Sequence, residues 1–514
     1  MGLSQLYGQT KTIKEKVDSV LRLMTLEEKI GQLNQLNDDK PTGPVTVIEN
    51  KGALIQKGGV GSLINTVGTE RNRKWQELAM KSRMKIPLLF GQDVIHGFKT
   101  TFPIPLAEAC SWDLEAIKTS ARIAAIEASA SGVQWTFAPM LDIARDPRWG
   151  RVMEGAGEDS YLASKIAEAR VRGFQGEGLG KLNSVMACAK HFVGYGAAVG
   201  GRDYNSVDMS QRMLWEIYLP PFKAALDAGV ATFMTSFNDL NGVPATSNKY
   251  LLTDVLREKW KFDGIVVSDW GAVGELLNHG NVKNRSEAAQ AALFAGCDID
   301  MESNCYKDNL LQLVTEKKIA VELIDQAVRR ILTKKFELGL FADPFRYFNA
   351  AREKQALNSP EHTKAAREIA AKSIVLLKNE NNILPLSKST KTIAFIGPLV
   401  KEVKQNKGFW DVEVPGVDST FIVSQWEGLN RKIGKSTTLL YAKGCSVDGN
   451  SRDGFAEAVA VAKRSDVVIL SIGEKRDMTG EAKSRSQIAI PGVQEELLKE
   501  LKATGKPIVV LINT

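Results

Sequence analysis

Short apolar runs alternate with helical patterns along the first 300 residues of the chain. Seven runs rich in β-branched residues occupy residues 60–67, 86–94, 135–143, 184–192, 231–237, 263–270 and 295–301. Helical patterns over 112–131, 214–228 and 286–295 lie among these runs, and residues 12–33 read as one amphipathic helix before them. Repeated alternation of this kind predicts parallel strands covered by helices, in either a barrel or a doubly wound sheet.

Most of the apolar runs end on a polar or charged residue. These residues are Asp93, Asp142, His191, Asn238, Asp269 and Asp300. In a barrel the carboxyl ends of the strands form one face, and ligands bind at that face. The recurrence therefore indicates one shared pocket and favours an α/β fold with a (β/α)8-type, TIM-like barrel over residues 1–340.

A second α/β pattern follows a change of character after residue 340. Residues 341–371 read as a linker that ends in a connecting helix, because residues 341–360 hold two prolines and show no clear periodicity. Four further apolar runs at 392–400, 437–444, 466–474 and 507–514 predict a second α/β unit over residues 372–514. The last run reaches the final residue, so we expect this domain to be incomplete and the chain to be part of a longer protein.

Composition narrows the class of protein. Of 514 residues, 44% are hydrophobic and 25% are charged, which is typical of globular domains and excludes disorder and fibrous repeats. The net charge of +7 is interspersed, without the basic block that nucleic-acid binding favours. Every apolar run falls short of the ~20 residues of a membrane span. The first residues lack an apolar signal core, and Leu6 stands where a myristoylation motif needs Ser or Thr.

Neither a metal nor a cofactor is predicted. The five cysteines contain no C-x-x-C motif, and no two of the four histidines have metal-ligand spacing. The glycine-rich stretch Gly194–Gly201 lacks the strand-to-helix spacing of a phosphate loop.

Asp269 is the first candidate for chemistry. It follows the run I-V-V-S directly, and a helix N-cap is the alternative explanation for an aspartate at this place. The neighbouring segments 92–97, 145–154 and 190–192 add an unusual density of Asp, Lys, His, Arg and Trp at strand ends. Such a mixture suits a neutral polyhydroxylated ligand, because charged groups bind its hydroxyls and tryptophan stacks on its apolar face.

Four motifs then identify a relationship. They are RDPRWGRVMEGAGEDSYL (145–162), KHFVGYGAAVGGRDYNSVDMS (190–210), GIVVSDWGAV (264–273) and GEKRDMTGEAKSRSQIAIPGVQEEL (473–497). With these the chain resembles the β-glucosidases of glycoside hydrolase family three, in particular the bacterial periplasmic branch. The resemblance implies a barrel followed by a sandwich domain, exo-acting hydrolysis of terminal β-D-glucosyl residues, retention of anomeric configuration and no cofactor.

The resemblance also implies roles for single residues. Asp269 matches the nucleophile, and the acid/base comes from the second domain, where Glu481 and Glu474 are the candidates. We favour Glu481, which lies in the G-E-A-K-S-R loop four residues before Arg485. The residues expected to bind the sugar are Asp93, Arg151, Glu154, Lys190, His191, Met234, Trp270 and Trp410. The family's N-acetylglucosaminidases carry their catalytic histidine in the loop after K-H-F-P-G-H. Here the segment reads K-H-F-V-G-Y-G, with Tyr195 and no histidine before Ser210, which argues against their mechanism.

Three alternatives stay open at this point. The same carboxylates would serve a β-xylosidase or a linkage-specific glucosidase, because subsite shape decides the sugar. A catalytically impaired fragment that only binds carbohydrate is the third. The expected partners are a small oligosaccharide or an aryl β-glucoside, and a homodimer is possible. The implied location is periplasmic or secreted for a full-length protein, or cytoplasmic if it is never exported.

Overall fold

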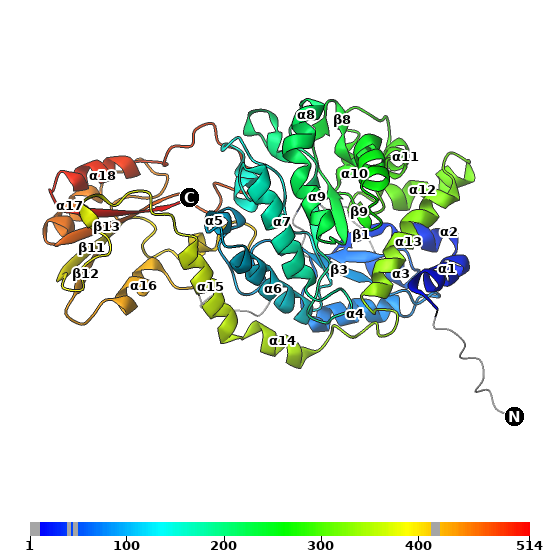
Figure 1. Ribbon diagram of the computed structural model, residues 1–514, viewed down its shortest axis with the longest axis horizontal. Helices are drawn as coiled ribbons and strands as arrows, with labels where there is room; N and C mark the ends of the chain where they lie inside the picture. The colour runs from blue at the N-terminus through cyan, green and yellow to red at the C-terminus, as the bar shows by residue number, and fades with distance from the viewer. Residues whose placement is uncertain (1–10, 39–42, 45–49, 413–421) are drawn as a thin grey trace. The chain divides into compact units, whose positions relative to one another are not determined.

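The computed structural model of the chain describes residues 11–38, 43–44, 50–412 and 422–514 (Figure 1). It divides into two compact units. The first holds most of the chain up to Ser373 together with Trp410, and the second holds Ile374 onwards together with Pro147–Arg151. None of the helices in the described ranges is long and apolar enough to span a membrane. The expectation about an N-terminal signal concerns residues 1–10, which lie outside the described residues.

Eight parallel strands of the first unit close into a barrel. They are β1 (Asn34–Asn37), β2 (Ser62–Ile64), β3 (Leu89–Gln92), β4 (Trp135–Thr136), β5 (Cys188–Phe192), β6 (Thr232–Thr235), β9 (Ile265–Val267) and β10 (Asp300–Met301). The strand orders are β10-β1-β2-β3-β4 and β5-β6-β9. Parallel bridges from Trp135 to Met186 and from Val267 to Ile299 join the two sheets at both ends. The predicted barrel is confirmed.

Helices surround the strands, as Figure 1 shows for α6, α7 and α9. The α-helices of this unit are α1 (Ile13–Leu23), α2 (Leu26–Gln32), α3 (Lys51–Gln56), α4 (Thr69–Ala79), α5 (Pro105–Cys110), α6 (Leu114–Ala130), α7 (Ser160–Gln175), α8 (Gln211–Met213), α9 (Pro220–Asp227), α10 (Ala272–Glu275), α11 (Arg285–Ala295), α12 (Cys305–Thr315), α13 (Val321–Glu337), α14 (Ala350–Leu357) and α15 (Pro360–Lys372). Two π-helical segments, Leu214–Tyr218 and Tyr250–Lys259, and the short hairpin β7 (Asp239–Leu240)–β8 (Val243–Pro244) complete it.

Three of the predicted elements differ in the structure. The helix expected over 12–33 is two helices, because Thr12 and Thr25 each begin a helix with a capping box. The helix expected over 214–228 is a π-helical turn followed by α9, which starts at Pro220, where a proline without an N–H is tolerated. The linker expected to be irregular contains α14, which Asn349 caps by accepting from Arg352 N.

Strand β1 was not predicted at all. Its four residues read N-Q-L-N, and all of them are buried. Side-chain hydrogen bonds offset part of the cost of this burial, since Asn34 Nδ2 donates to Gly59 O (3.2 Å) and Gln35 Nε2 donates to Ser62 Oγ (3.0 Å). A strand stabilised in this way has no hydrophobic periodicity from which it could be found.

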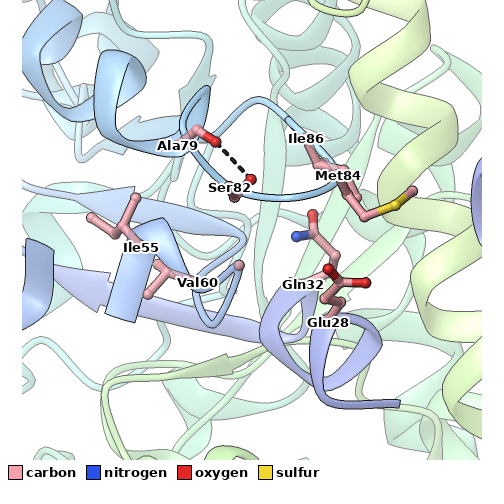
Figure 2. A pocket seen from close by; sticks show the side chains of 9 residues that line it. Glu28, Gln32, Ile55, Val60, Ala79, Ser82, Met84 and Ile86 are labelled. Atoms are coloured by element: carbon pink, nitrogen blue, oxygen red, sulfur yellow. Dashed lines mark hydrogen bonds between the residues drawn. The ribbon is translucent and has the colours of Figure 1, made fainter. Parts of the chain in front are cut away.

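The N-terminal ends of the strands carry a small, partly open hollow (Figure 2). Val60 and Ile86, which line it, precede β2 and β3, and Gln32 precedes β1. The hollow therefore lies at the opposite end of the barrel from the residues that follow the strands. In barrel enzymes that end contributes to stability, and the chemistry is at the other face.

A buried lysine also lies at this end. Lys335 on α13 is fully buried and donates to Gln32 Oε1 (2.6 Å) and Gly61 O (2.9 Å). Burial lowers the pKa of Lys335 to about 7.

This depressed pKa makes stability depend on pH. Above pH 7 the folded protein holds Lys335 neutral, whereas the unfolded chain keeps its proton up to about pH 10.5. The free energy of unfolding should therefore rise with pH between these values, by about 1.4 kcal/mol per pH unit from this group. Denaturant titrations at pH 7.5 and 9.5 should show that K335M loses this slope. An equal slope in both proteins would contradict the assignment.

The second unit is a four-stranded parallel sheet with helices on both faces. Its order is β12 (Thr438–Ala442), β11 (Thr392–Ile396), β13 (Val467–Gly473) and β14 (Ile508–Asn513). One apolar cluster packs α17 (Phe455–Lys463) and α18 (Gln494–Lys502) on one face, and another packs residues of α16 (Gln425–Lys432) on the other. Each of the four apolar runs predicted here forms a strand.

Candidate active site

Buried charged groups gather where the barrel strands end. Asp93 follows β3, Lys190 and His191 lie on β5, and Asp269 lies two residues beyond β9. Lys190 Nζ lies 2.9 Å from Asp93 Oδ1 and 3.3 Å from Glu154 Oε1. The fold therefore brings residues from four separate segments together, because the carboxyl ends of parallel strands share one face.

His191 lies between two carboxylates. Its Nδ1 is 2.8 Å from Asp142 Oδ2, which also accepts from the backbone N–H of His191 (3.0 Å). Its Nε2 is 3.4 Å from Asp269 Oδ2. Because Asp142 fixes one ring nitrogen, the other is held towards Asp269.

The side chains differ in how far solvent reaches them. Lys190, His191 and Glu154 are 2%, 1% and 1% exposed, whereas Asp93 and Asp269 are 9% and 8% exposed. The two aspartates are thus the carboxylates of this group that are most open to a ligand. A ligand that contacts both aspartates would lie against ion-paired side chains that are already in position.

The N-cap alternative for Asp269 is wrong. Helix α10 has Gly271 as its N-cap, with no side-chain hydrogen bond to the helix. The Asp269 carboxylate instead accepts from the backbone N–H of Trp270 (2.7 Å). Its position after β9 is therefore not explained by helix capping.

Apolar and aromatic groups border this cluster. The Trp410 ring lies 5.7 Å from Lys190 Nζ, within cation–π range. Trp270 is half-buried and its Nε1 donates to Pro44 O (2.8 Å). Met234 is buried on β6, in register with Val267 of β9, so it lies beside the strand that precedes Asp269.

Arg151 and Glu481 meet within the second unit. Arg151 Nη1 lies 3.3 Å from Glu481 Oε1, and the arginine side chain is almost completely buried. Glu474, the other candidate, follows β13 and is ion-paired with Arg485 of the same loop. The two glutamates therefore have different partners.

The segment before Arg151 and the Glu481 loop are fastened through their backbones; we call this arrangement the backbone clip. Gly150 N donates to Lys483 O (3.0 Å), Gly480 N donates to Gly150 O (2.7 Å) and Arg485 N donates to Arg148 O (3.0 Å). A Cβ on Gly150 would lie 2.4 Å from Gly480 O, so no other residue fits.

One strand-end residue does not join the cluster in the way that was expected. Asp300 hydrogen-bonds to Ser303 and Tyr306 at the start of α12, and burial raises the pKa of its carboxyl. The idea that every polar strand end meets in one pocket is thus wrong for Asp300. Conversely, the sequence marks Asp142 as a strand-end residue but does not predict its contact with His191.

Other chemistries receive no support from this region. Cys188 on β5 is buried, and burial raises the pKa of its thiol to about 12, so it stays protonated at neutral pH. In the described part of the chain, no group of three His, Cys, Asp or Glu side chains is placed to hold a metal ion.

The orientation of His191 gives a test. We expect D142N to lower kcat/KM by roughly 10- to 100-fold, because His191 loses the carboxylate that orients its ring, and to lower Tm as well, because this carboxylate is buried and hydrogen-bonded. D300N is the matched control, since Asp300 is an equally buried strand-end carboxylate bonded to its own helix; it should lose stability and keep kcat/KM. Steady-state kinetics and thermal melts measure both. Unchanged kcat/KM in D142N would show that His191 is oriented by other contacts.

A parallel barrel with carboxylates, a lysine and a histidine at its ligand-binding face, followed by an α/β sandwich, defines the class of enzyme. Residues 25–334 match the glycosyl hydrolase family 3 N-terminal domain, and residues 374–514 match the glycosyl hydrolase family 3 C-terminal domain. The chain belongs to glycosyl hydrolase family 3 and is a glycoside hydrolase, as the sequence predicts.

Individual relatives are also glycoside hydrolases. The chain is 41% identical to a periplasmic beta-glucosidase of Salmonella typhimurium over 96% of this chain and 67% of that protein. It is 38% identical to a beta-xylosidase of Formosa agariphila over 99% of this chain and 69% of that protein. The structure of a Listeria innocua beta-glucosidase in complex with isofagomine superposes with a TM-score of 0.91, at 40% identity, over 97% of this chain and 69% of that one.

Proposed function

We propose that this protein is a retaining, exo-acting β-glucosidase that removes terminal non-reducing β-D-glucosyl residues. The observation that carries the proposal is the Asp269 carboxylate, placed 3.4 Å from His191 at the ligand-binding end of a buried network that includes Lys190 and Asp93. Relatives named as beta-glucosidases, at 40–41% identity, support glucose as the sugar.

The proposed reaction has two steps. Asp269 Oδ attacks the anomeric carbon and forms a glycosyl ester, while the acid gives its proton to the glycosidic oxygen and the C–O bond to the aglycone breaks. The same acid, now a base, takes a proton from water, whose oxygen attacks the anomeric carbon and releases Asp269. Two inversions give net retention, and glucose leaves as the β-anomer.

The groups around Asp269 would bind the enclosed sugar. Asp93, as a carboxylate, accepts hydrogen bonds from hydroxyls, and Lys190 and His191 donate them. Glu154 holds the Lys190 ammonium group in place, and Asp142 holds the His191 imidazole. We propose Arg151 as a further hydroxyl ligand, Trp270 and Trp410 as aromatic walls, and Met234 as an apolar contact.

We propose Glu481 as the acid/base. Both glutamates are ion-paired, but Glu481 pairs with Arg151, which is itself a proposed sugar ligand, whereas Glu474 pairs with Arg485 of its own loop. In this proposal residues 1–340 carry the nucleophile, 341–371 form the connection, and 372–514 carry the acid/base.

The substrate would be a small oligosaccharide or an aryl β-glucoside. The relative named as a periplasmic enzyme supports a periplasmic location, and a homodimer remains part of the proposal.

A panel of aryl β-glycosides tests the activity. We expect the glucoside to be turned over faster than the xyloside, galactoside and N-acetylglucosaminide, with β-glucose seen first by proton NMR. Preference for the xyloside would favour the beta-xylosidase relatives as the model. If a folded protein bound glucose and turned over none of the four, it would be a binding protein.

A further inference from the structure

An aromatic cluster, defined here as Tyr195, Tyr204 and Phe237, extends outward from His191. The Tyr195 ring meets the His191 ring edge to face with centroids 5.1 Å apart. Tyr195 contacts Tyr204 (6.4 Å) and Phe237 (5.9 Å), and Tyr204 meets Phe237 edge to face at 5.0 Å. Ring contacts thus lead from the imidazole beside Asp269 to Tyr204.

The cluster lies on the catalytic face of the barrel. Tyr195 and Tyr204 belong to the loop after β5, and Phe237 follows β6, so both loops leave strands at their carboxyl ends. The loop after β5 is fastened to the β7–β8 hairpin, since Val207 N donates to Asp239 O (3.0 Å) and Asn241 N donates to Val207 O (2.8 Å). Tyr204 therefore belongs to a loop that backbone hydrogen bonds hold in place.

The three aromatic residues differ in solvent exposure. Tyr195 is 0% and Phe237 is 7% exposed, but Tyr204 is 42% exposed. Tyr204 also has a φ of +63°, which is uncommon for a tyrosine and costs free energy. The Tyr204 ring thus packs against Phe237 in a disfavoured backbone conformation, and part of the residue is open to solvent at the face where the barrel strands end.

We propose that Tyr204 is a specificity-determining residue that binds the aglycone of the substrate, with a preference for a sugar ring whose C–H face packs on the tyrosine ring. This inference rests on the proposed exo-β-glucosidase activity. An exo enzyme encloses one sugar ring, so the ring on the other side of the scissile bond lies at the rim. Tyrosine suits such a contact because its ring is apolar and its hydroxyl is polar.

The test compares substrates with and without an aglycone ring. Laminaribiose has a sugar aglycone, whereas β-glucosyl fluoride has none. We expect Y204A to lower kcat/KM for laminaribiose by roughly three- to tenfold, through KM, and to leave kcat/KM for the fluoride within twofold of the original protein. Y204F should keep most of the laminaribiose activity, because the ring is retained.

Tyr161 offers a matched control. It is a 70% exposed tyrosine on α7 whose ring contacts Lys165 of the same helix, so Y161A should change neither substrate. An equal fall of both substrates in Y204A, or no change in either, would overturn the aglycone role. Failure of the unmodified protein to hydrolyse the fluoride would instead refute the proposed function, so the two failures are distinguishable.

Discussion

Replacing Asp269 by asparagine is expected to lower kcat for an aryl β-glucoside by at least about 10⁴-fold, because the amide cannot form the glycosyl ester. The change is nearly isosteric, and the neighbouring network of His191, Asp142, Lys190 and Asp93 stays in place. Affinity for gluconolactone, measured by calorimetry, should therefore change much less than turnover. Burst and steady-state kinetics with the purified variant measure the loss.

The shorter variant D269A gives a chemical control. With azide added, the nitrogen nucleophile can attack the anomeric carbon from the face that Asp269 vacates while the aglycone leaves. The expected product is α-glucosyl azide, of inverted configuration. Its formation would identify Asp269 as the missing nucleophile, whereas residual hydrolysis to β-glucose at more than a hundredth of the original rate would contradict the assignment.

Replacing Glu481 by glutamine is expected to make turnover depend on the leaving group. Proton transfer to the glycosidic oxygen contributes roughly 10²- to 10⁴-fold, so hydrolysis of laminaribiose should fall by that factor. The first step with a dinitrophenyl glucoside needs no proton and should persist, so that the glycosyl ester accumulates. Azide should then displace Asp269 and give β-glucosyl azide, of retained configuration.

E474Q is the matched comparison for Glu481. Glu474 is paired with Arg485, so its loss should loosen the loop and lower activity equally for good and poor leaving groups. If instead E474Q showed the leaving-group dependence and formed β-glucosyl azide, the two glutamates would exchange roles. Rates for both variants on both substrates decide between these outcomes.

Most of the strands that the sequence predicted lie in runs of apolar residues. The runs ending in Asp93 and Asp269 became β3 and β9, and every apolar run of the second unit became a strand. Strand β1 was missed because its buried residues are polar, and the side-chain N–H groups of Asn34 and Gln35 donate to partners elsewhere in the fold. Polar burial of this kind is decided by partners distant in the sequence, which a local pattern does not contain.

The site likewise contains residues that the local sequence predicts and pairings that it does not. Recurrence at strand ends is local, so Asp93, His191 and Asp269 could be selected from the sequence. The orientation of His191 by Asp142 depends on a contact across 49 residues, and the pairing of Arg151 with Glu481 depends on one across 330. Neither pairing leaves a signal in residue spacing, and both required coordinates.

The backbone clip has a consequence for exchanging specificity between relatives. Backbone hydrogen bonds join Gly150 to the Glu481 loop, and they leave no room for a side chain at Gly150. The conformations of the two segments therefore depend on each other. A Glu481 loop taken from a homologue would have to form these hydrogen bonds with the Pro147–Arg151 segment of this chain, whose backbone conformation is not matched to it. Successful chimeras of this family should therefore exchange both segments together, although some 330 residues separate them in the chain.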